Sequence, residues 1–400
     1  MRLVLAVLPA VALVGAVPST TEPAPAPAWR IAQIRGIGVD GEISSMSPDG
    51  DWLAGIGPEG TLCLWEVDTL TPSCDDTELP ISRQTPLPSM AWAPDSSAVA
   101  FDLNALVFGI DSDIYVYDVA DAELANLTED GYAGSLLDAP TATPIDIAPT
   151  WSPDGSQLAF VRSPVGDGDS RSTTIMRVDR GGGDPVPIHR LDVDEPFAVW
   201  TPMHWLADDT ILYAQTAVDV EDSANGIWRV ALDGGTPSRL KLDSSEEELP
   251  GAAIAGARGD SLSLVSLVLV GQAGDPTVTR FWTAGLDGST HPILNVDPDT
   301  GAAVPSDDVS IDESAEGFTL AWPVTPAGLS PTGDTGLVAY RDGDQLAFAL
   351  LEPSTGDHQL LELRIPFVPT DATPPQWAAN DLALLRGPPG NALVLTLEQT

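Results

Sequence analysis

The sequence has very few basic residues. Lys241 is the only lysine, and 17 basic residues stand against 59 acidic ones, for a formal net charge of −42. Binding to nucleic acid or to an anionic membrane surface needs clustered lysine and arginine, so the composition argues against both roles. The excess of carboxylates indicates either an acidic face for cations and basic partners or a surface that charge keeps soluble, as in proteins from salty environments.

Motifs for metal binding, cofactor binding and nucleophilic catalysis are also missing. The four histidines, His189, His204, His291 and His358, follow none of the spacings of a zinc site. The chain contains no phosphate-binding P-loop, no dinucleotide-binding fingerprint and no G-x-S-x-G nucleophile elbow. The sequence therefore predicts no catalytic residue and no cofactor.

Only two cysteines are present, Cys63 and Cys74, eleven residues apart. They flank the segment LWEVDTLTPS, in which a turn near Asp68 and Thr69 would place the two sulfurs opposite each other on neighbouring strands. In an exported chain this arrangement predicts a disulfide, with two free buried thiols as the alternative.

The N-terminus carries a short hydrophobic run. Arg2 is followed by LVLAVLPAVALVG, and Val14 and Ala16 stand where signal-peptidase sites have small residues. The run is shorter than the ~20 apolar residues of a membrane span, so residues 1–16 are predicted to be a signal peptide, with an uncleaved anchor as the alternative. Residues 17–28 are predicted to form a Pro/Ala-rich tether. We therefore expect the chain in the periplasm, at the cell surface or outside the cell.

A motif repeats along the rest of the chain. MSPDGDWLAGI starts at Met46, WAPDSSAVAF at Trp92 and WSPDGSQLAF at Trp151, and looser copies follow. The aspartate position of the seven copies is occupied, in order, by Asp49, Asp95, Asp154, Asp208, Arg258, Thr332 and Asn380. Each unit holds four short strands with alternating apolar residues and almost no amphipathic helical pattern, which is typical of a β-propeller blade.

The sequence thus predicts an all-β fold with a single β-propeller over residues 29–400. Seven markers predict seven four-stranded blades, and six or eight remain alternatives because an acidic insertion at about 296–327 lengthens one interval. Only 20 residues follow Asn380, enough for three strands. The segment WRIAQIRGI, residues 29–37, is predicted to supply the fourth strand of the last blade and so to close the ring.

The motif copies at Met46, Trp92 and Trp151 resemble the repeat of the TolB-like, or WD40-like, propellers, which also builds the propeller of prolyl oligopeptidase relatives. The resemblance covers most of residues 29–400 and implies an exported propeller, while saying little about activity. Neither the α/β domain that precedes the TolB propeller nor the hydrolase domain of the oligopeptidases is expected in this chain.

The repeated turn is expected to be structural. In residues 152–155, SPDG, the serine, proline and glycine suit the positions of a type I turn. Because the aspartate recurs in related copies, catalysis by any one of them is not expected. The tryptophan that ends the innermost strand can fill the wedge between blades, and it occurs at Trp92, Trp151, Trp205 and Trp377.

Paired carboxylates in loops are weak candidates for a Ca²⁺ site, and an acidic composition produces such pairs by itself. The pairs are Asp167 with Asp169 and Asp297 with Asp299, and a further group contains Asp219, Glu221 and Asp222. None completes the pattern of an EF-hand loop, so the sequence predicts no metal site, with a bound Ca²⁺ at one of these pairs as the alternative.

The loops between the second and third strands, and those between blades, hold most of the length and variation. They share one face of the predicted disc, and loops on a rigid scaffold are where binding residues gather. Aromatic side chains within or beside them could bind a partner: Tyr132, Phe197, Trp200 and Trp322. The alternative is that these loops are tolerated insertions without a function.

The sequence favours an exported, non-catalytic propeller that binds a protein or small ligand through its acidic, loop-rich face. We expect a monomer that binds no nucleic acid and has no integral membrane span after signal cleavage. The alternative is an enzyme of lyase or lactonase type that acts on a sugar-like substrate with a divalent cation. That alternative calls for a ring of inward-facing histidines, arginines and carboxylates, and four scattered histidines do not supply one.

Overall fold

The computed structural model describes most of the predicted propeller domain. The described residues are 29–77, 79, 89–103, 110–132, 134–135, 143–165, 173–191, 203–215, 225–243, 253–269, 277–293, 295–296, 303–304, 327–342, 345–366, 375–379, 381–387 and 390–399. The predicted signal peptide and tether, and most of the predicted acidic insertion, lie outside them.

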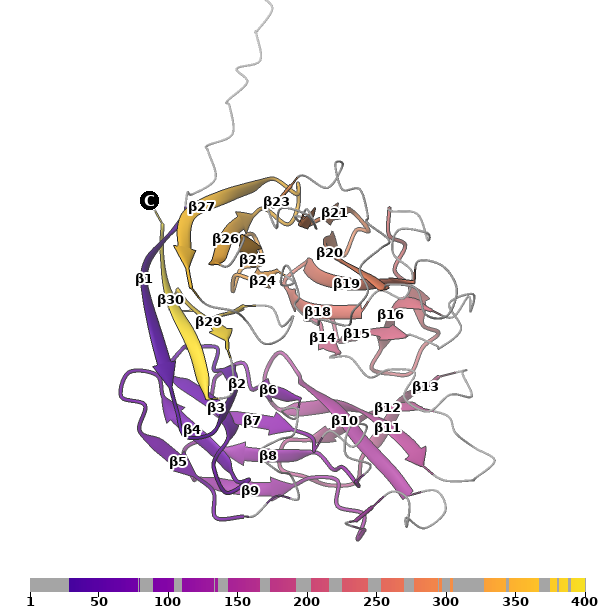
Figure 1. The fold of residues 1–400 in the computed structure, drawn as a ribbon. Helices are drawn as coiled ribbons and strands as arrows, with labels where there is room; N and C mark the ends of the chain where they lie inside the picture. The colour runs from indigo at the N-terminus through magenta and orange to yellow at the C-terminus, as the bar shows by residue number, and fades with distance from the viewer. Residues whose placement is uncertain are drawn as a thin grey trace, which may run out of the picture.

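Seven four-stranded antiparallel sheets form the blades of a β-propeller (Figure 1). Blade 1 consists of β2 (Glu42–Met46), β3 (Trp52–Ile56), β4 (Leu62–Glu66) and β5 (Pro72–Cys74). Blade 2 consists of β6 (Met90–Trp92), β7 (Ala98–Phe101), β8 (Tyr115–Asp118) and β9 (Glu123–Asn126). Blade 3 consists of β10 (Thr143–Trp151), β11 (Gln157–Val165), β12 (Thr174–Asp179) and β13 (Val186–Arg190).

The second half of the ring continues in the same order. Blade 4 consists of β14 (His204–Trp205), β15 (Thr210–Gln215), β16 (Gly226–Ala231) and β17 (Ser238–Arg239), and blade 5 of β18 (Ala253–Arg258), β19 (Ser261–Leu269), β20 (Thr277–Gly285) and β21 (Thr290–Pro292). Blade 6 consists of β24 (Gly328–Leu329), β25 (Gly336–Asp342), β26 (Gln345–Leu351) and β27 (His358–Ile365). A separate pair, β22 (Asn295–Val296) and β23 (Ala303–Val304), precedes blade 6. The predicted fold class and the count of seven blades are confirmed.

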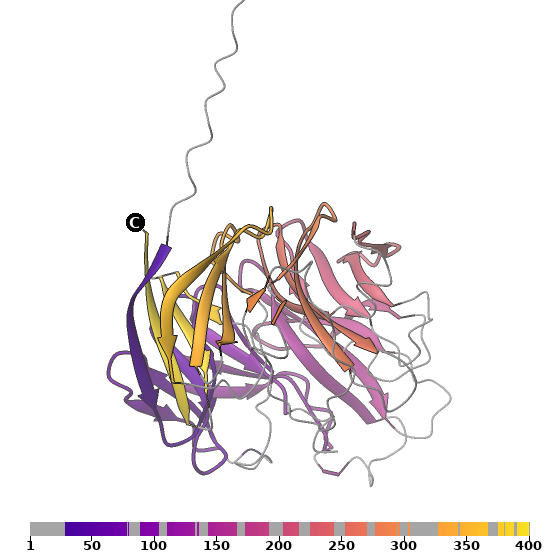
Figure 2. The ribbon, with the colours of Figure 1, turned by 45° about the horizontal axis from the view of Figure 1, so that its top comes forward.

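Blade 7 joins the two ends of the described chain. It contains β28 (Gln376–Trp377), β29 (Leu382–Arg386), β30 (Asn391–Gln399) and, as its outermost strand, β1 (Trp29–Gly38). Strand β1 runs antiparallel to β30 from the Trp29–Gln399 pair to the Gly38–Asn391 pair, and the two strands lie side by side in both ribbon views (Figures 1 and 2). The predicted closure of the ring by the N-terminal strand is therefore confirmed.

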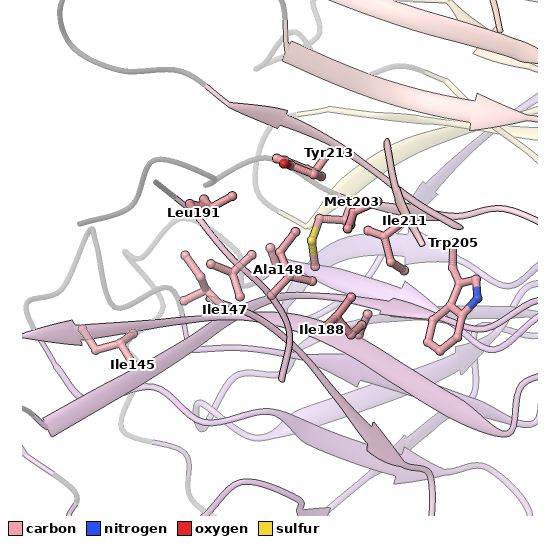
Figure 3. Packing of buried hydrophobic residues seen from close by; sticks show 13 residues of the cluster. Ile145, Ile147, Ala148, Ile188, Leu191, Met203, Trp205, Ile211 and Tyr213 are labelled. Atoms are coloured by element: carbon pink, nitrogen blue, oxygen red, sulfur yellow. The ribbon is translucent and has the colours of Figure 1, made fainter. Parts of the chain in front are cut away.

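The core is a series of apolar layers between neighbouring blades. Strands that lie second in their blades are buried on both faces, as in Leu53 and Ala54 of β3, because another blade packs on each side. This explains why such strands read as continuous apolar runs. Figure 3 shows one layer, in which Ile145 and Ile147 of blade 3 pack with Trp205 and Ile211 of blade 4. Similar clusters join the other neighbouring pairs of blades.

Blade 1 also carries the two cysteines. Cys63 on β4 and Cys74 on β5 are directly opposite partners in the ladder, and a disulfide joins them with their Cα atoms 4.1 Å apart. Because Cys74 lies on the outermost strand of the blade, the disulfide ties that strand to a fully buried position.

Closure of the ring can be tested at Trp29. The Trp29 side chain is buried, and its indole packs edge-on against the indole of Trp377, with the ring centroids 5.2 Å apart. We expect Trp29→Ala to lower the free energy of unfolding by about 3–5 kcal/mol, since it removes a large aromatic side chain from the core. Urea unfolding followed by circular dichroism measures this loss.

The matched control is the neighbouring residue on the same strand. Arg30 points outward and forms an exposed ion pair with Glu398 at 2.7 Å, so Arg30→Ala should cost less than about 1 kcal/mol. Equal effects of the two substitutions would show that the packing of β1 does not hold the ring closed.

Candidate functional site

In the repeated turns, the aspartate carboxylate accepts hydrogen bonds from residues of its own turn. In blade 3 an Asp154 Oδ1 atom accepts hydrogen bonds from the Ser152 hydroxyl at 2.7 Å, from the Ser156 amide at 3.0 Å and from the Ser156 hydroxyl at 2.8 Å. These bonds, led by that of Ser152, lower the pKa of Asp154 to about 2. Gly155 completes the turn with a φ of +70°, which a glycine adopts without strain.

The other copies use the same bonds with local changes. Asp49 accepts from the hydroxyl of Ser47, and Asp95 accepts from Ser97. Asp208 accepts from the hydroxyl of Thr210 at 2.6 Å and forms an ion pair with Arg229. In blade 6 the carboxylate is two residues beyond the marker Thr332, because Asp334 accepts from Ser330 at 2.9 Å and from Thr332 at 2.7 Å.

The marker tryptophans lie between blades. The indole nitrogen of Trp92 donates to the Ser45 hydroxyl at 3.0 Å, and that of Trp151 donates to the Ala91 carbonyl at 2.8 Å. Both bonds reach the innermost strand of the preceding blade. Trp205 and Trp377 are buried, and within the described part of the chain their indole nitrogens have no hydrogen-bond partner. The turn face is thus occupied by contacts that hold blades together.

A different group of carboxylates lies at the opposite ends of the strands, where blades 2 and 3 meet. We call it the acid cluster, and it consists of Asp111, Asp113, Asp130 and Asp146 with Arg162. Asp111 and Asp113 lie in the loop between β7 and β8, and Asp130 follows β9. Asp146 belongs to the innermost strand of blade 3, β10, and Arg162 to the adjacent β11.

Backbone hydrogen bonds hold these segments in place. The amide of Asp111 donates to the Gly134 carbonyl at 2.8 Å, and the amide of Asp146 donates to the Ser112 carbonyl at 2.8 Å. The residues 110–114 are therefore fixed between the chain that leaves blade 2 and the innermost strand of blade 3. The carboxylates are presented by a supported backbone rather than by a free loop.

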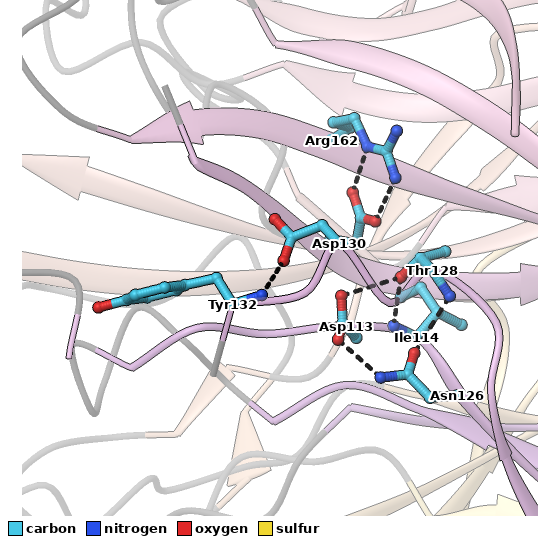
Figure 4. A network of polar contacts seen from close by, with 8 residues as sticks. Asp113, Ile114, Asn126, Thr128, Asp130, Tyr132 and Arg162 are labelled. Atoms are coloured by element: carbon cyan, nitrogen blue, oxygen red, sulfur yellow. Dashed lines mark hydrogen bonds and ion pairs between the residues drawn. The ribbon is translucent and has the colours of Figure 1, made fainter. Parts of the chain in front are cut away.

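Asp146 and Arg162 form the one buried ion pair of the cluster. The guanidinium Nε and Nη2 atoms donate to the two carboxylate oxygens of Asp146 at 2.7 and 2.6 Å (Figure 4). The Asp146 side chain is only 2% exposed, and this burial raises its pKa, a rise that the guanidinium opposes. Two parallel bonds fix the orientation of both groups.

Asp113 is surrounded by neutral donors. Its Oδ2 atom accepts from the Asn126 amide at 2.7 Å, and its Oδ1 atom accepts from the Thr128 hydroxyl at 3.4 Å (Figure 4). The Thr128 hydroxyl oxygen in turn accepts from the Ile114 amide at 2.9 Å. Burial raises the pKa of Asp113, and the bond from Asn126 opposes this rise. Among the described residues Asp113 forms no ion pair, and the charge of Arg162 acts on it only from beyond contact distance.

Asp111 is the least satisfied member. The residue is 6% exposed, and its Oδ1 atom is buried without a hydrogen-bond partner among the described residues. Burial, followed by the charges of Asp113, Asp130 and Asp146, raises its pKa to about 7. A carboxyl in this state changes its charge near neutral pH, and strongly perturbed groups of this kind concentrate at functional sites.

The structure places only some of the residues singled out from the sequence at this face. Tyr132 lies beside the acid cluster, where its amide donates to Asp130 at 2.8 Å and its hydroxyl donates to the Ser135 carbonyl at 2.6 Å. Phe197, Trp200 and Trp322 lie outside the described residues, and so do the candidate calcium ligands Asp167, Asp169, Asp297 and Asp299. Within the described ranges no group of three or more His, Cys, Asp or Glu side chains could hold a metal ion.

Sequence reasoning missed all five acid-cluster residues: Asp111, Asp113, Asp130, Asp146 and Arg162. One local signal was present, since Asp146 interrupts the apolar strand TPIDIAPTW. A charged residue in a strand that is buried on both faces needs a partner, and Arg162 stands opposite it in the β10–β11 ladder.

Comparisons with known proteins find the fold and no family. No family model and no curated protein sequence matches the chain. A solved structure of oligogalacturonate lyase in complex with manganese is 14% identical, covers 91% of this chain and 91% of its own, and superposes with a TM-score of 0.53. Oligogalacturonate lyase from Vibrio parahaemolyticus is 11% identical, with coverages of 92% and 98% and a TM-score of 0.53.

TolB from Acinetobacter baumannii is 15% identical over 91% of this chain, with a TM-score of 0.44. This chain spans 66% of the length of that protein. At 11–14% identity the two lyase structures share the propeller fold alone with this chain, and the seven blades of the structure confirm the propeller expected from the TolB-like motif. In the described part of the chain, no helix has the length and apolar character to cross a membrane.

The ion pair of the acid cluster gives a test of its rigidity. We expect Arg162→Met to lower the free energy of unfolding by about 3–5 kcal/mol, because it leaves the buried Asp146 carboxylate without its counter-ion. Adding Asp146→Leu should restore much of the loss, since no unpaired charge then stays buried. Urea unfolding at neutral pH measures both variants, and a loss below about 1 kcal/mol for Arg162→Met would contradict this account of the cluster.

Proposed function

We propose that the chain is an exported, non-catalytic β-propeller that binds a basic protein or ligand through its acidic, loop-rich face. The observation that carries the proposal is the acid cluster, in which four carboxylates face a single arginine at the junction of blades 2 and 3.

The two faces differ in how their carboxylates are used. Turn aspartates such as Asp154 are bonded by serines of their own turn, which supports a structural role. Within the acid cluster, Asp111 and Asp113 are buried and lack a cationic partner among the described residues. Natural proteins rarely bury unpaired carboxylates, and those that do commonly use them to bind or to react.

The net charge supports the same kind of partner. A formal charge of −42 attracts cationic molecules over several ångströms and raises their rate of encounter with the protein. The same field repels nucleic acid and anionic lipid surfaces. The export part of the proposal rests on the apolar N-terminal run, residues 1–16, and on the Pro/Ala-rich segment that follows it.

The enzyme alternative has less support. The structures that superpose with a TM-score of 0.53 are lyases, but their 11–14% identity carries only the fold over to this chain. The carboxylates of the acid cluster are not grouped as metal ligands, and no histidine belongs to the cluster. The described residues therefore provide no set of groups on which a metal-assisted elimination could be built.

A comparison of the two faces tests the proposal. Asp130 is the exposed member of the acid cluster and Glu129 is its exposed neighbour, whereas Asp184 and Asp233 lie on turns of the opposite face. We expect Glu129→Lys with Asp130→Lys to reduce the recovery of partner proteins from an envelope extract by about tenfold, because the change reverses the attraction at the binding face. Chemical cross-linking with quantitative mass spectrometry measures the recovery.

The control is Asp184→Lys with Asp233→Lys, which changes the net charge by the same amount. Its recovery of partners should match that of the unaltered chain. If both double variants lose partners equally, the attraction is a general effect of charge, and the acidic loop face has no special role.

A further inference from the structure

We propose that the acid cluster binds a basic side chain of the partner, an arginine guanidinium or a lysine ammonium, and that the Asp111 carboxylate is its main acceptor. This inference rests on the proposed function and names the chemical group that the loop face recognises. It also makes the binding proton-linked.

The acid cluster has more negative than positive charge, so a further cation would be bound favourably. Arg162 uses its Nε and Nη2 atoms in the bidentate pair with Asp146, and that pair is complete. Asp111 and Asp113 have only neutral donors or none among the described residues. Burying like charges together is costly, and an added cation relieves that repulsion.

The geometry of Asp111 indicates where the cation binds. Its Oδ1 atom is buried and has no donor among the described residues, although the residue as a whole is 6% exposed. An unpaired buried acceptor loses its hydration without compensation, and a charged donor provides the strongest hydrogen bond that a carboxylate can accept. The backbone bonds of Asp111 and Asp146 hold this acceptor in place before any partner arrives.

An organic cation fits the cluster better than a metal ion. Calcium needs six to eight oxygens converging at about 2.3–2.6 Å. The described acids are not placed in such a group, because no three of the His, Cys, Asp or Glu side chains there are positioned to ligate one ion. A guanidinium has five N–H donors and an ammonium has three, and either can bond a single carboxylate oxygen. Tyr132, next to the cluster, adds an aromatic surface on which the stem of such a side chain can pack.

The state of Asp111 makes binding depend on pH. The titratable groups whose charges act on Asp111 or on its immediate neighbours are Asp113 and Tyr115 on its own loop and strand, Glu129 and Asp130 after β9, and Asp146 and Arg162 of blade 3. Asp102, which follows β7, accepts a hydrogen bond from the Ala148 amide at 2.9 Å. The pKa of Tyr115 is raised to about 12, by burial first, so this group stays neutral near pH 7. Asp111, with a pKa of about 7, changes its charge there, and burial also raises the pKa of Asp113 and of Asp146.

The sign of the effect follows from the raised pKa. Below about pH 6 most Asp111 carboxyls are protonated and cannot accept the cation as a carboxylate, while above about pH 8 most are ionised. Because the apparent dissociation constant is divided by the competent fraction, affinity should rise about tenfold from pH 6 to pH 8. Binding near pH 7 should release about half a proton per complex, because about half of the Asp111 carboxyls are already ionised there.

The experiment uses the full propeller chain and a blocked hexa-arginine peptide. Isothermal titration calorimetry at physiological salt, in buffers of different ionisation enthalpy, gives the affinity and the number of protons released. For the unaltered chain we expect about tenfold tighter binding at pH 8 than at pH 6 and release of about half a proton per complex near pH 7. Asp111→Asn should bind about tenfold more weakly at pH 8 and should lose most of the pH dependence.

Asp184→Asn is the matched control, since it makes the same change of charge on the opposite face. It should bind the peptide as the unaltered chain does. Thermal melting at pH 8 checks that Asp111→Asn is folded, and the proton count on the unaltered chain does not depend on any variant.

Three results would overturn the proposal. The first is equal affinity and equal pH dependence for Asp111→Asn and the unaltered chain. The second is the absence of peptide binding at both pH values, and the third is displacement of the peptide by stoichiometric Ca²⁺, which would assign the cluster to a metal. The double substitution of Glu129 and Asp130 by lysine tests the proposed function separately. If that variant loses its partner proteins while Asp111→Asn keeps them, the acidic face still binds partners, and only the role assigned here to Asp111 is wrong.

Discussion

Stacking of neighbouring blades is the constraint on which the whole structure depends. A strand such as β11 buries Leu158 and Phe160 against blade 2 and Ala159 and Val161 against blade 4, so it is stable only with a neighbour on each side. If the ring of blades were open, the first and the last blade would each expose one apolar face to water. The pairing of β1 with β30 removes both ends, because blade 7 then packs on blade 6 and on blade 1.

The same stacking gives aspartate two opposite environments. On the turn face, Asp154 is exposed and bonded by serines, so its pKa falls to about 2. At the other end of the layer between blades 2 and 3, Asp111 is enclosed by protein and by other carboxylates, and its pKa rises to about 7. The first arrangement stabilises a turn at every pH at which proteins normally work. The second stores unfavourable electrostatic free energy that a cationic partner can relieve.

The blades could be predicted from the sequence because most blades repeat the same bonds in the turn between their first two strands. Even Arg258 and Thr332, which lack a carboxylate, mark real turns, and in blade 6 Asp334 supplies the missing group from two residues away. The acid cluster could not be predicted in this way. Asp111, Asp130 and Asp146 come from three segments, and only the stacking of blades 2 and 3 brings them together and buries Asp111 and Asp146. Carboxylates close together in the sequence, such as Asp167 and Asp169, were predicted as candidate calcium ligands because a sequence shows the spacing of residues and not their contacts in the fold.

The central claim is that the loop face holds a carboxyl group in an unsatisfied, charge-crowded environment. The pKa of Asp111 measures this directly, through the ¹³C chemical shift of its carboxyl carbon followed over pH, with Asp111→Asn used to identify the resonance. The structure predicts a midpoint of about 7. A midpoint near the ordinary aspartate value of about 3.9 would mean that the group is solvated or already paired, and would contradict the account of this site.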